Sequence, residues 1–257
     1  MSSAYGSIAR PVSDRSLATV LPRHATLKSH SNPKEGKEET HSSPNATLFR
    51  IASKQETLDE LSQSYTLSGR THQSLVKAMQ QVLNGEVLAG DTYPQEFLLD
   101  DAQFEGYFFS GDAFVLLKGH YQQATEVEPK EFHYWDKDLL GFFYVKPNFP
   151  ICNGGFVVNP IHRGLGIGSI LGKAFLKLVP VIGYKASMFN LVFTSNVASI
   201  KLWRRLGFQE IGRIPKAGRL RGQGSSKKVS EEDDNEGYVD AIQFYWDFET
   251  MVVPAEI

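Results

Sequence analysis

The sequence predicts an α/β (α+β) domain in which helices flank a central mixed, mostly antiparallel β-sheet. Apolar, aromatic-rich runs come first in the chain and later alternate with amphipathic stretches, an order typical of a sheet covered by helices. The length of 257 residues suggests one to two domains, and 41% hydrophobic residues with 12% aromatic residues are sufficient to build a real core.

The composition narrows the classes of function. With 27 basic and 29 acidic residues the formal charge is −2, so the chain has no general attraction to nucleic acid or to an anionic membrane. No apolar run reaches the roughly 18 residues that a transmembrane helix needs. The single cysteine, Cys152, excludes an intramolecular disulfide framework and a cysteine-rich zinc site. We expect a soluble, cytoplasmic enzyme or binding module with no metal, nucleic-acid or membrane partner.

The first 45 residues differ from the rest of the chain. They are rich in Ser, Thr, Pro, Asn, His and Lys and lack hydrophobic periodicity, so they bury too little apolar surface to offset the entropy of ordering. We predict a disordered tail over residues 1–45 and a globular domain over residues 46–257. The first thirty residues carry four basic residues and one acid, which is compatible with a mitochondrial transit peptide. A solvated tail and a targeting segment both remain open.

Two helices are predicted near the start of the globular part. Ser53 followed three residues later by Glu56 forms a capping-box pattern, which predicts a helix over residues 53–65. Apolar residues along one side of residues 71–83 predict a second helix, and Asn84-Gly85 should end it.

The later strands are apolar runs flanked by Gly or Pro, and the later helices follow glycine or asparagine. The polar residues 120–137 predict a hairpin loop. Residues 219–237, basic and then acidic, predict a solvated loop inserted between two hairpin strands, with a regulatory or partner-binding role as the alternative. The predicted strands are residues 47–52, 112–117, 139–145, 155–158, 188–194, 208–214 and 239–248, and the later helices are residues 168–178 and 198–206.

The most informative segment is the turn that follows the strand ending at Val158. Gly164, Gly166 and Gly168 alternate there before an amphipathic helix, and they allow backbone torsions and close approaches that a Cβ would prevent. Backbone amides converge at the N-terminus of that helix, where the unpaired donors and the helix dipole favour an anion. With Arg163 as a fixed cation beside them, these residues predict a diphosphate site.

Two common phosphate-binding motifs do not fit this turn. The glycine spacing differs from the dinucleotide fingerprint, and the absence of a following Gly-Lys-Ser/Thr excludes a P-loop. The pattern Arg-x-x-Gly-x-Gly, formed by Arg163, Gly166 and Gly168, instead resembles the acetyl-CoA signature of the GNAT superfamily of N-acetyltransferases. The resemblance implies a GNAT-like fold with acetyl-CoA as co-substrate, and a glycine turn without a ligand is the alternative.

A second segment, residues 196–208, resembles a later motif of the same superfamily. Asn196 can cap the helix in this segment, and the resemblance also places it beside the pantetheine arm; capping alone is the alternative. Many relatives have a tyrosine general acid where this chain has Trp203, whose indole carries no acidic proton of useful pKa. The predicted cofactor contacts are Val157, Val158, Arg163, Gly164, Leu165, Gly166, Ile167, Gly168, Ser169 and Asn196.

Further segments carry a narrower resemblance: Leu139–Asn148, Cys152–Phe156, Gly183–Lys185, Phe189–Phe193 and Pro215–Gly218. This resemblance covers residues 92–248 and is to the fungal L-azetidine-2-carboxylate (proline-analogue) N-acetyltransferases. It implies acetyl transfer to the nitrogen of a small cyclic imino acid, in a protein that can form a homodimer, with Asn153 and Asn190 holding the substrate. Asn190 interrupts an apolar strand, where a buried amide needs partners. The alternatives are an asparagine bonded to backbone for Asn190 and a plain turn or bulge for Asn153.

The expected reaction is direct attack of the acceptor amine on the thioester, without an acyl-enzyme. The matched segments contain no obvious carboxylate or histidine base, so we expect water-mediated deprotonation, with the backbone at Val157 and Val158 polarising the thioester carbonyl. We expect His162 to be solvated or to face a phosphate, and Cys152 to be a packed thiol rather than a nucleophile. A different amine (a polyamine, another amino acid or a protein N-terminus) and an acetyl-CoA-binding regulatory module remain alternatives.

Overall fold

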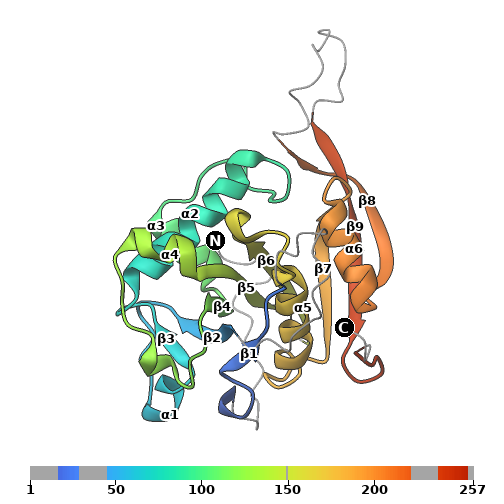
Figure 1. Ribbon diagram of the computed structural model, residues 1–257. Helices are drawn as coiled ribbons and strands as arrows, with labels where there is room; N and C mark the ends of the chain where they lie inside the picture. Colours follow the sequence, from blue (N-terminus) through green and yellow to red (C-terminus); the bar gives the residue numbers. More distant parts are fainter. Residues whose placement is uncertain (1–16, 29–44, 149, 221–236, 254–257) are drawn as a thin grey trace, which may run out of the picture.

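Figure 1 shows the computed structural model of the chain, which describes residues 17–28, 45–148, 150–220 and 237–253. Within these residues, one sheet of nine strands forms the centre of the molecule. The strands are β1 (Arg23–Ala25), β2 (Ala46–Ala52), β3 (Thr66–Ser68), β4 (Asp112–Lys118), β5 (Leu139–Asn148), β6 (Ile151–Val158), β7 (Ala186–Phe193), β8 (Gln209–Arg219) and β9 (Tyr238–Asp247).

The strands follow the order β1-β2-β4-β5-β6-β7-β9-β8, and β3 pairs with β2 outside this path. All neighbours pair antiparallel except β2 with β3 and β6 with β7, which are parallel. The predicted mixed, mostly antiparallel sheet is therefore confirmed. Side chains of β5 alternate between two hydrophobic cores, with Phe142 in one and Phe143 in the other.

Helices cover both faces of the sheet (Figure 1). Met79 of α2 (Gln73–Ala89) and Phe108 of α3 (Asp101–Phe108) belong to the core around Phe142. The core around Phe143 receives side chains of α5 (Ile167–Leu178) and α6 (Val197–Leu206). Both later helices were predicted to within one residue, because Gly166 marks the start of α5, and Asn196 and Gly207 mark the two ends of α6.

The helix predicted over residues 53–65 is wrong. Only a short helix, α1 (Glu60–Gln63), forms there, and it is capped by Asp59 rather than by Ser53. Glu56, the acid of the expected capping box, instead forms an ion pair with Arg50, with 2.7 Å between Arg50 Nη1 and Glu56 Oε1. A contact to the sheet has therefore replaced the local capping interaction.

The second predicted helix continues past Asn84-Gly85 and ends at Gly90, which adopts a left-handed conformation with φ 68°. Asn84 does not end the helix because its amide makes two 2.9 Å hydrogen bonds with the backbone of Leu99. The helix α3 was not predicted from the sequence, although Asp100 and Gln103 form a complete capping box at its start.

The connection over residues 120–137 joins two antiparallel strands, as predicted, but it contains short helical turns and α4 (Trp135–Asp138), and Trp135 is fully buried. At the other end of the sheet, β8 runs to Arg219, beyond the predicted strand at 208–214. It pairs antiparallel with β9 across the charged stretch, of which residues 221–236 lie outside the described part.

The tail predicted over residues 1–45 is wrong for residues 17–28. Strand β1 pairs antiparallel with β2, and Leu21 is buried in the core that contains Phe143. Apolar side chains at Leu17, Val20 and Leu27 accompany it, so this part of the segment does bury apolar surface. Residues 1–16 and 29–44 lie outside the described part of the chain.

Candidate active site

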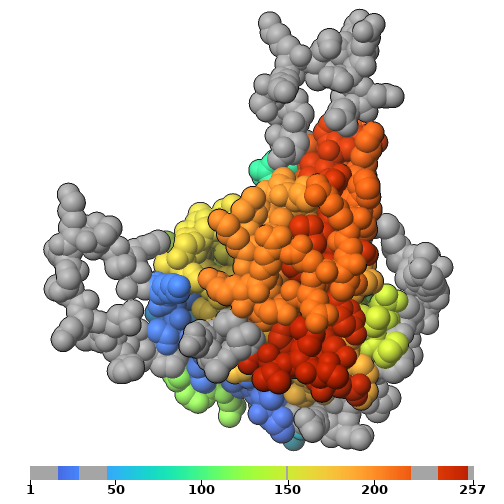
Figure 2. Space-filling view, turned by 90° about the vertical axis from the view of Figure 1, so that its right-hand side faces the viewer, coloured from blue at the N-terminus to red at the C-terminus, as the bar shows by residue number. Residues whose placement is uncertain are grey.

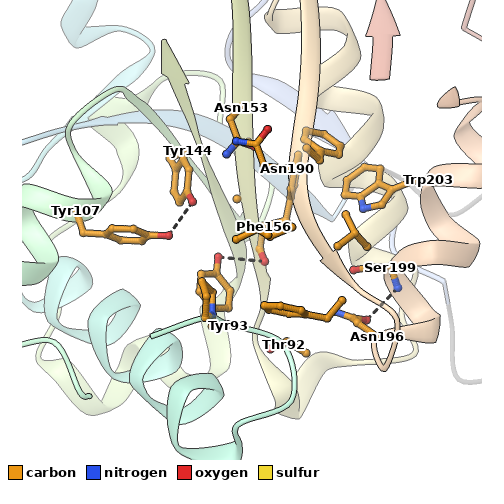
Figure 3. Close-up of a pocket in the computed structure, with 17 residues that line it drawn as sticks. Thr92, Tyr93, Tyr107, Tyr144, Asn153, Phe156, Asn190, Asn196, Ser199 and Trp203 are labelled. Atoms are coloured by element: carbon orange, nitrogen blue, oxygen red, sulfur yellow. Dashed lines mark hydrogen bonds between the residues drawn. The ribbon is translucent and has the colours of Figure 1, made fainter. Parts of the chain in front are cut away.

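The candidate site lies where two parallel strands separate. The register of β6 and β7 contains only two pairs, Ile151 with Ala186 and Cys152 with Ser187. Beyond them a cavity of about 210 Å³ is lined by both strands (Figure 3). Its lining residues are Thr92, Tyr93, Pro94, Tyr107, Tyr144, Asn153, Gly154, Gly155, Phe156, Phe189, Asn190, Leu191, Val192, Phe193, Asn196, Ser199 and Trp203.

The glycine turn follows β6 directly and leads into α5. Gly164 and Gly166 have φ values of 88° and 78°, and Gly166 occupies the N-cap position of α5. A side chain would strain the backbone at both positions. Gly168 has no positive φ; a Cβ there would be 3.5 Å from Leu202, an ordinary contact. The predicted need for backbone torsions that favour glycine is therefore confirmed at Gly164 and Gly166 but not at Gly168.

Arg163 does not stand alone beside this turn. Its Nη2 atom lies 2.5 Å from Oε1 of Glu86, a buried carboxylate on α2. The other oxygen of Glu86 accepts a 3.0 Å hydrogen bond from Thr92, which lines the cavity. Sequence analysis missed Glu86, although an acid beside Leu83 and Val87 on the apolar side of a helix is a usable signal.

Basic side chains surround the start of α5. The amide of Lys28 donates a 3.2 Å hydrogen bond to the Leu165 carbonyl, so the N-terminal segment lies against the glycine turn (Figure 2). Arg205 of α6 donates a 2.5 Å hydrogen bond to the Ser169 hydroxyl. Burial, followed by repulsion from nearby cations that include Arg205 and Lys28, lowers the pKa of Lys173. This concentration of positive charge suits a phosphate-rich ligand.

Asn196 has the capping role that the sequence predicts. Its side-chain oxygen accepts a 3.1 Å hydrogen bond from the Ser199 amide, and both residues line the cavity. Trp203, one turn after Ser199 along α6, is buried and packs against Phe156 and Phe189, with ring centroids 4.8 Å and 4.6 Å away. The tryptophan therefore acts as an apolar wall of the cavity.

The structure brings Asn153 and Asn190 to the same cavity from opposite strands (Figure 3). The side-chain oxygen of Asn190 is buried and has no hydrogen-bond partner among the described residues. A buried carbonyl oxygen in this state costs free energy unless a ligand or water donates to it. The backbone-bonded alternative for Asn190 therefore does not account for this oxygen.

Three tyrosines complete the cavity, and none was singled out as a site residue from the sequence. The hydroxyl groups of Tyr107 and Tyr144 lie 2.8 Å apart, and the Tyr93 hydroxyl donates a 3.5 Å hydrogen bond to the Phe156 carbonyl (Figure 3). Burial is the main reason that the pKa values of Tyr93 and Tyr144 lie well above the ordinary value. These two phenols remain protonated at neutral pH and serve as neutral walls and donors.

Two other residues weighed from the sequence have no catalytic geometry. Cys152 is fully buried, and burial raises the pKa of its thiol to about 12, which supports the packed reading. His162 Nε2 lies 3.0 Å from the Asp136 carbonyl oxygen. Within the described residues, no group of three or more His, Cys, Asp or Glu side chains is arranged to hold a metal ion. In the same residues, no helix has the length and apolar character to cross a membrane.

Comparisons with known proteins agree with this geometry. The profile of the Acetyltransferase (GNAT) family matches residues 96–208. N-acetyltransferase aca1 of Schizosaccharomyces pombe is 36% identical over 189 residues, which cover 71% of this chain and 84% of that protein. Protein SPT10 of Saccharomyces cerevisiae is 27% identical over 177 residues, which cover 54% of this chain and 28% of SPT10.

Solved structures share the fold. A GCN5-related N-acetyltransferase from Kribbella flavida matches with a TM-score of 0.51 and 23% identity, over 67% of this chain and 91% of that one. A phosphinothricin acetyltransferase from Sinorhizobium meliloti, solved in complex with acetyl-CoA, matches with a TM-score of 0.50 and 14% identity, over 72% and 90% of the two chains. The architecture is thus that of a GNAT acetyltransferase.

The relationship to aca1 goes further than the fold, because it spans most of both proteins at more than a third of identical residues. The chain belongs to the acetyltransferase (GNAT) family and is an acetyl-CoA-dependent N-acetyltransferase. The site fits that co-substrate: two glycines free of Cβ atoms at the start of α5, cations around them, and separated strands between which an extended arm can lie.

Proposed function

We propose that this N-acetyltransferase acetylates the nitrogen of a small imino or amino acid such as azetidine-2-carboxylate or a proline-related metabolite. The observation that carries the proposal is the pair Asn153 and Asn190 in one cavity, with the Asn190 oxygen buried and unpartnered within the described residues. The cavity volume of about 210 Å³ also supports a small acceptor, because pockets for drug-sized ligands measure roughly 300–1,000 Å³.

The proposed roles follow from the chemistry of the lining. Asn153 and Asn190 each offer an amide donor and a carbonyl acceptor, which can hold both the carboxylate and the nitrogen of an amino acid. The turn from Arg163 to Ser169 would hold the diphosphate of acetyl-CoA, and Asn196 would lie beside its pantetheine arm. When bound, that co-substrate supplies an activated acetyl group. The backbone amide of Val158 points away from β5 and is suited to polarise the thioester carbonyl, whereas the amide of Val157 faces Phe142 of β5.

Proton removal is proposed to use water. The cavity lining contains no histidine, aspartate, glutamate or lysine, and the buried tyrosines Tyr93 and Tyr144 are held in their neutral forms. An acceptor ammonium must still lose a proton before its nitrogen can attack. The rate should then rise with pH toward the pKa of the acceptor amine itself, and it should follow that pKa when the acceptor is changed.

The test is acetylation of azetidine-2-carboxylate by the wild type and by Asn153→Ala and Asn190→Ala. Each variant should lose roughly 100-fold in kcat/KM, because a buried polar contact to the substrate is removed. Binding of acetyl-CoA, followed by calorimetry, should remain. Asn148→Ala is the matched control, since Asn148 is exposed at the end of β5 and outside the cavity lining. Full activity in both cavity variants would show that the substrate-site assignment is wrong.

A panel of acceptors separates this proposal from the other amines. A polyamine, proteinogenic amino acids and a peptide with a free N-terminus should each react more slowly than azetidine-2-carboxylate. Preference for one of them would replace the proposed substrate while leaving the acetyltransferase activity intact. Binding of acetyl-CoA without acetylation of any amine would point to a regulatory module.

We also propose a cytoplasmic homodimer, with mitochondrial import through the first thirty residues as the alternative location. Composition supports the first location and the basic, hydroxyl-rich start of the chain supports the second. Fluorescent fusions of the whole chain and of a form lacking residues 1–16 distinguish the two locations, and sedimentation of the pure protein gives its oligomeric state.

A further inference from the structure

A partly buried cation lies over two of the tyrosine rings that line the cavity. The ammonium group of Lys146 is 3.4 Å from the ring centroid of Tyr107 and 4.2 Å from that of Tyr144. Both rings line the cavity, and their hydroxyl groups are hydrogen-bonded to each other. The two phenol rings therefore hold a positive charge beside the place where the acceptor is proposed to bind.

The register of the sheet explains why this lysine lies there. Lys146 of β5 is the cross-strand partner of Asn153 on β6, so the two side chains emerge on the same face of the sheet. Tyr144 is two residues earlier on the same strand and shares that face. Lys146, Tyr144 and the substrate-holding Asn153 thus form one cluster at one end of the cavity.

The charge of Lys146 has no counter-charge within the described residues. The lysines at 54, 77, 130 and 185 each form an ion pair with an acid, whereas no acid of the described residues pairs with Lys146. Burial lowers the pKa of Lys146 to about 8, so the ammonium form still predominates at neutral pH. A partly buried ammonium that only aromatic rings stabilise gains free energy when an anion binds beside it.

We infer that Lys146 is a specificity-determining residue, which selects acceptors that carry a carboxylate next to the reacting nitrogen. This inference rests on the proposed function and adds a reason for its substrate class. A cation at this end attracts an amino acid or imino acid through its carboxylate. The same charge repels a polyamine, and it gains nothing from a peptide N-terminus, whose neighbouring carbonyl group is neutral.

The experiment compares acceptors that differ only in the carboxylate: azetidine-2-carboxylate with its amide, and proline with prolinamide. Lys146→Met should lower kcat/KM for the two carboxylates roughly 10- to 100-fold, the range of a charged contact, mainly through a higher KM. The two amides should change less than about threefold, the scatter of a weak contact. Lys146→Arg keeps the charge and should retain most of the preference. The ratio between acceptors cancels their different intrinsic reactivities.

A binding measurement provides a readout besides activity. Calorimetry of azetidine-2-carboxylate with the protein saturated with coenzyme A should show roughly 10-fold or greater weakening in Lys146→Met. Lys130→Met is the matched control, because Lys130 also lies over an aromatic ring, that of Trp135 at 5.2 Å. The ring of Trp135 does not line the cavity, whereas the rings of Tyr107 and Tyr144 under Lys146 do. Lys146→Gln should behave like Lys146→Met and serves if the latter does not fold.

The outcomes distinguish failure of the inference about Lys146 from failure of the proposed function. Equal losses on the carboxylates and the amides would assign Lys146 a purely structural role and overturn the inference, while the proposed function stands. Unchanged preference in Lys146→Met would overturn it in the same way. A wild type that acetylates none of the four acceptors would overturn the proposed function and the inference with it.

Discussion

Replacing Gly155 by alanine should destabilise the protein, because the ring of Tyr144 lies directly against this glycine. A Cβ at position 155 would be 2.3 Å from Cζ, 2.4 Å from Oη and 2.5 Å from Cε1 of Tyr144. Carbon atoms in contact are about 3.5–4.0 Å apart, so the ring must move by roughly 1 Å or more. The ring has little room, since Tyr144 is buried and hydrogen-bonded to Tyr107.

The magnitude follows from two contributions. Overpacking of a buried site costs about 1–3 kcal/mol, and loss of the hydrogen bond between Tyr107 and Tyr144 adds about 0.5–1.5 kcal/mol. The free energy of unfolding should therefore fall by about 1.5–4.5 kcal/mol. For a domain of this size each kcal/mol lowers Tm by about 2–4 °C, so Gly155→Ala should melt about 3–18 °C below the wild type.

Thermal and urea unfolding followed by circular dichroism measure the effect. Gly85→Ala is the matched control, because no atom lies within 4 Å of a Cβ built at this position inside α2. It should raise the free energy of unfolding by about 0.5–1 kcal/mol through helix propensity. In a Tyr144→Ala background, which removes the ring, Gly155→Ala should cost less than about 0.5 kcal/mol. An equal cost in both backgrounds would refute the assignment of the clash to Tyr144.

Two further predictions concern buried ionisable groups. Cys152, with a pKa of about 12 and no exposed surface, should not react with Ellman's reagent at pH 8 in the native protein, but one thiol should react in denaturant; rapid native labelling would contradict the packed reading. Lys146 has a folded pKa of about 8, lowered by burial from 10.5, so its unfavourable charge is present below pH 8 and is relieved as pH rises toward 10.5. The free energy of unfolding should then increase over that interval by up to about 3 kcal/mol, less whatever the two tyrosine rings contribute to the ammonium form. Urea unfolding at pH 7.5 and pH 10 should show this increase in the wild type and a smaller one in Lys146→Met; equal increases would contradict it.

Local signals in the sequence were sufficient where an element depends on its own residues. The helices α5 and α6 have strong apolar periodicity, and each is bounded by a residue with a specific backbone role, such as Asn196 at the start of α6 and Gly207 after it. The glycine turn before α5 is similarly local. These elements carry most of the predicted cofactor contacts, so the backbone around those residues could be predicted from the sequence.

Sequence reasoning failed where distant partners decide the outcome. Glu56 pairs with Arg50 instead of capping a helix, and Asn84 bonds to the backbone of Leu99 instead of ending one. The wall of the acceptor pocket depends on the same kind of contact, because Tyr93 and Tyr107 meet Tyr144 only after β5 has paired within the sheet. No local pattern links three such tyrosines, so the acceptor end could be predicted only from a family resemblance.

The separation of β6 and β7 also indicates how the acetyl donor and the acceptor amine would be oriented toward each other. The strands pair at Cys152 and Ser187 and separate beyond them, so the space between them is narrow near Asn153 and opens toward Val158. The narrow end suits a small acceptor, whereas the open end leads directly into the glycine turn at Arg163. A co-substrate held by that turn must extend its acyl end inward along β6, toward the acceptor. In the proposed reaction the divergence of the two strands would direct the thioester at the amine, and direct transfer without an acyl-enzyme would require no further side chain between them.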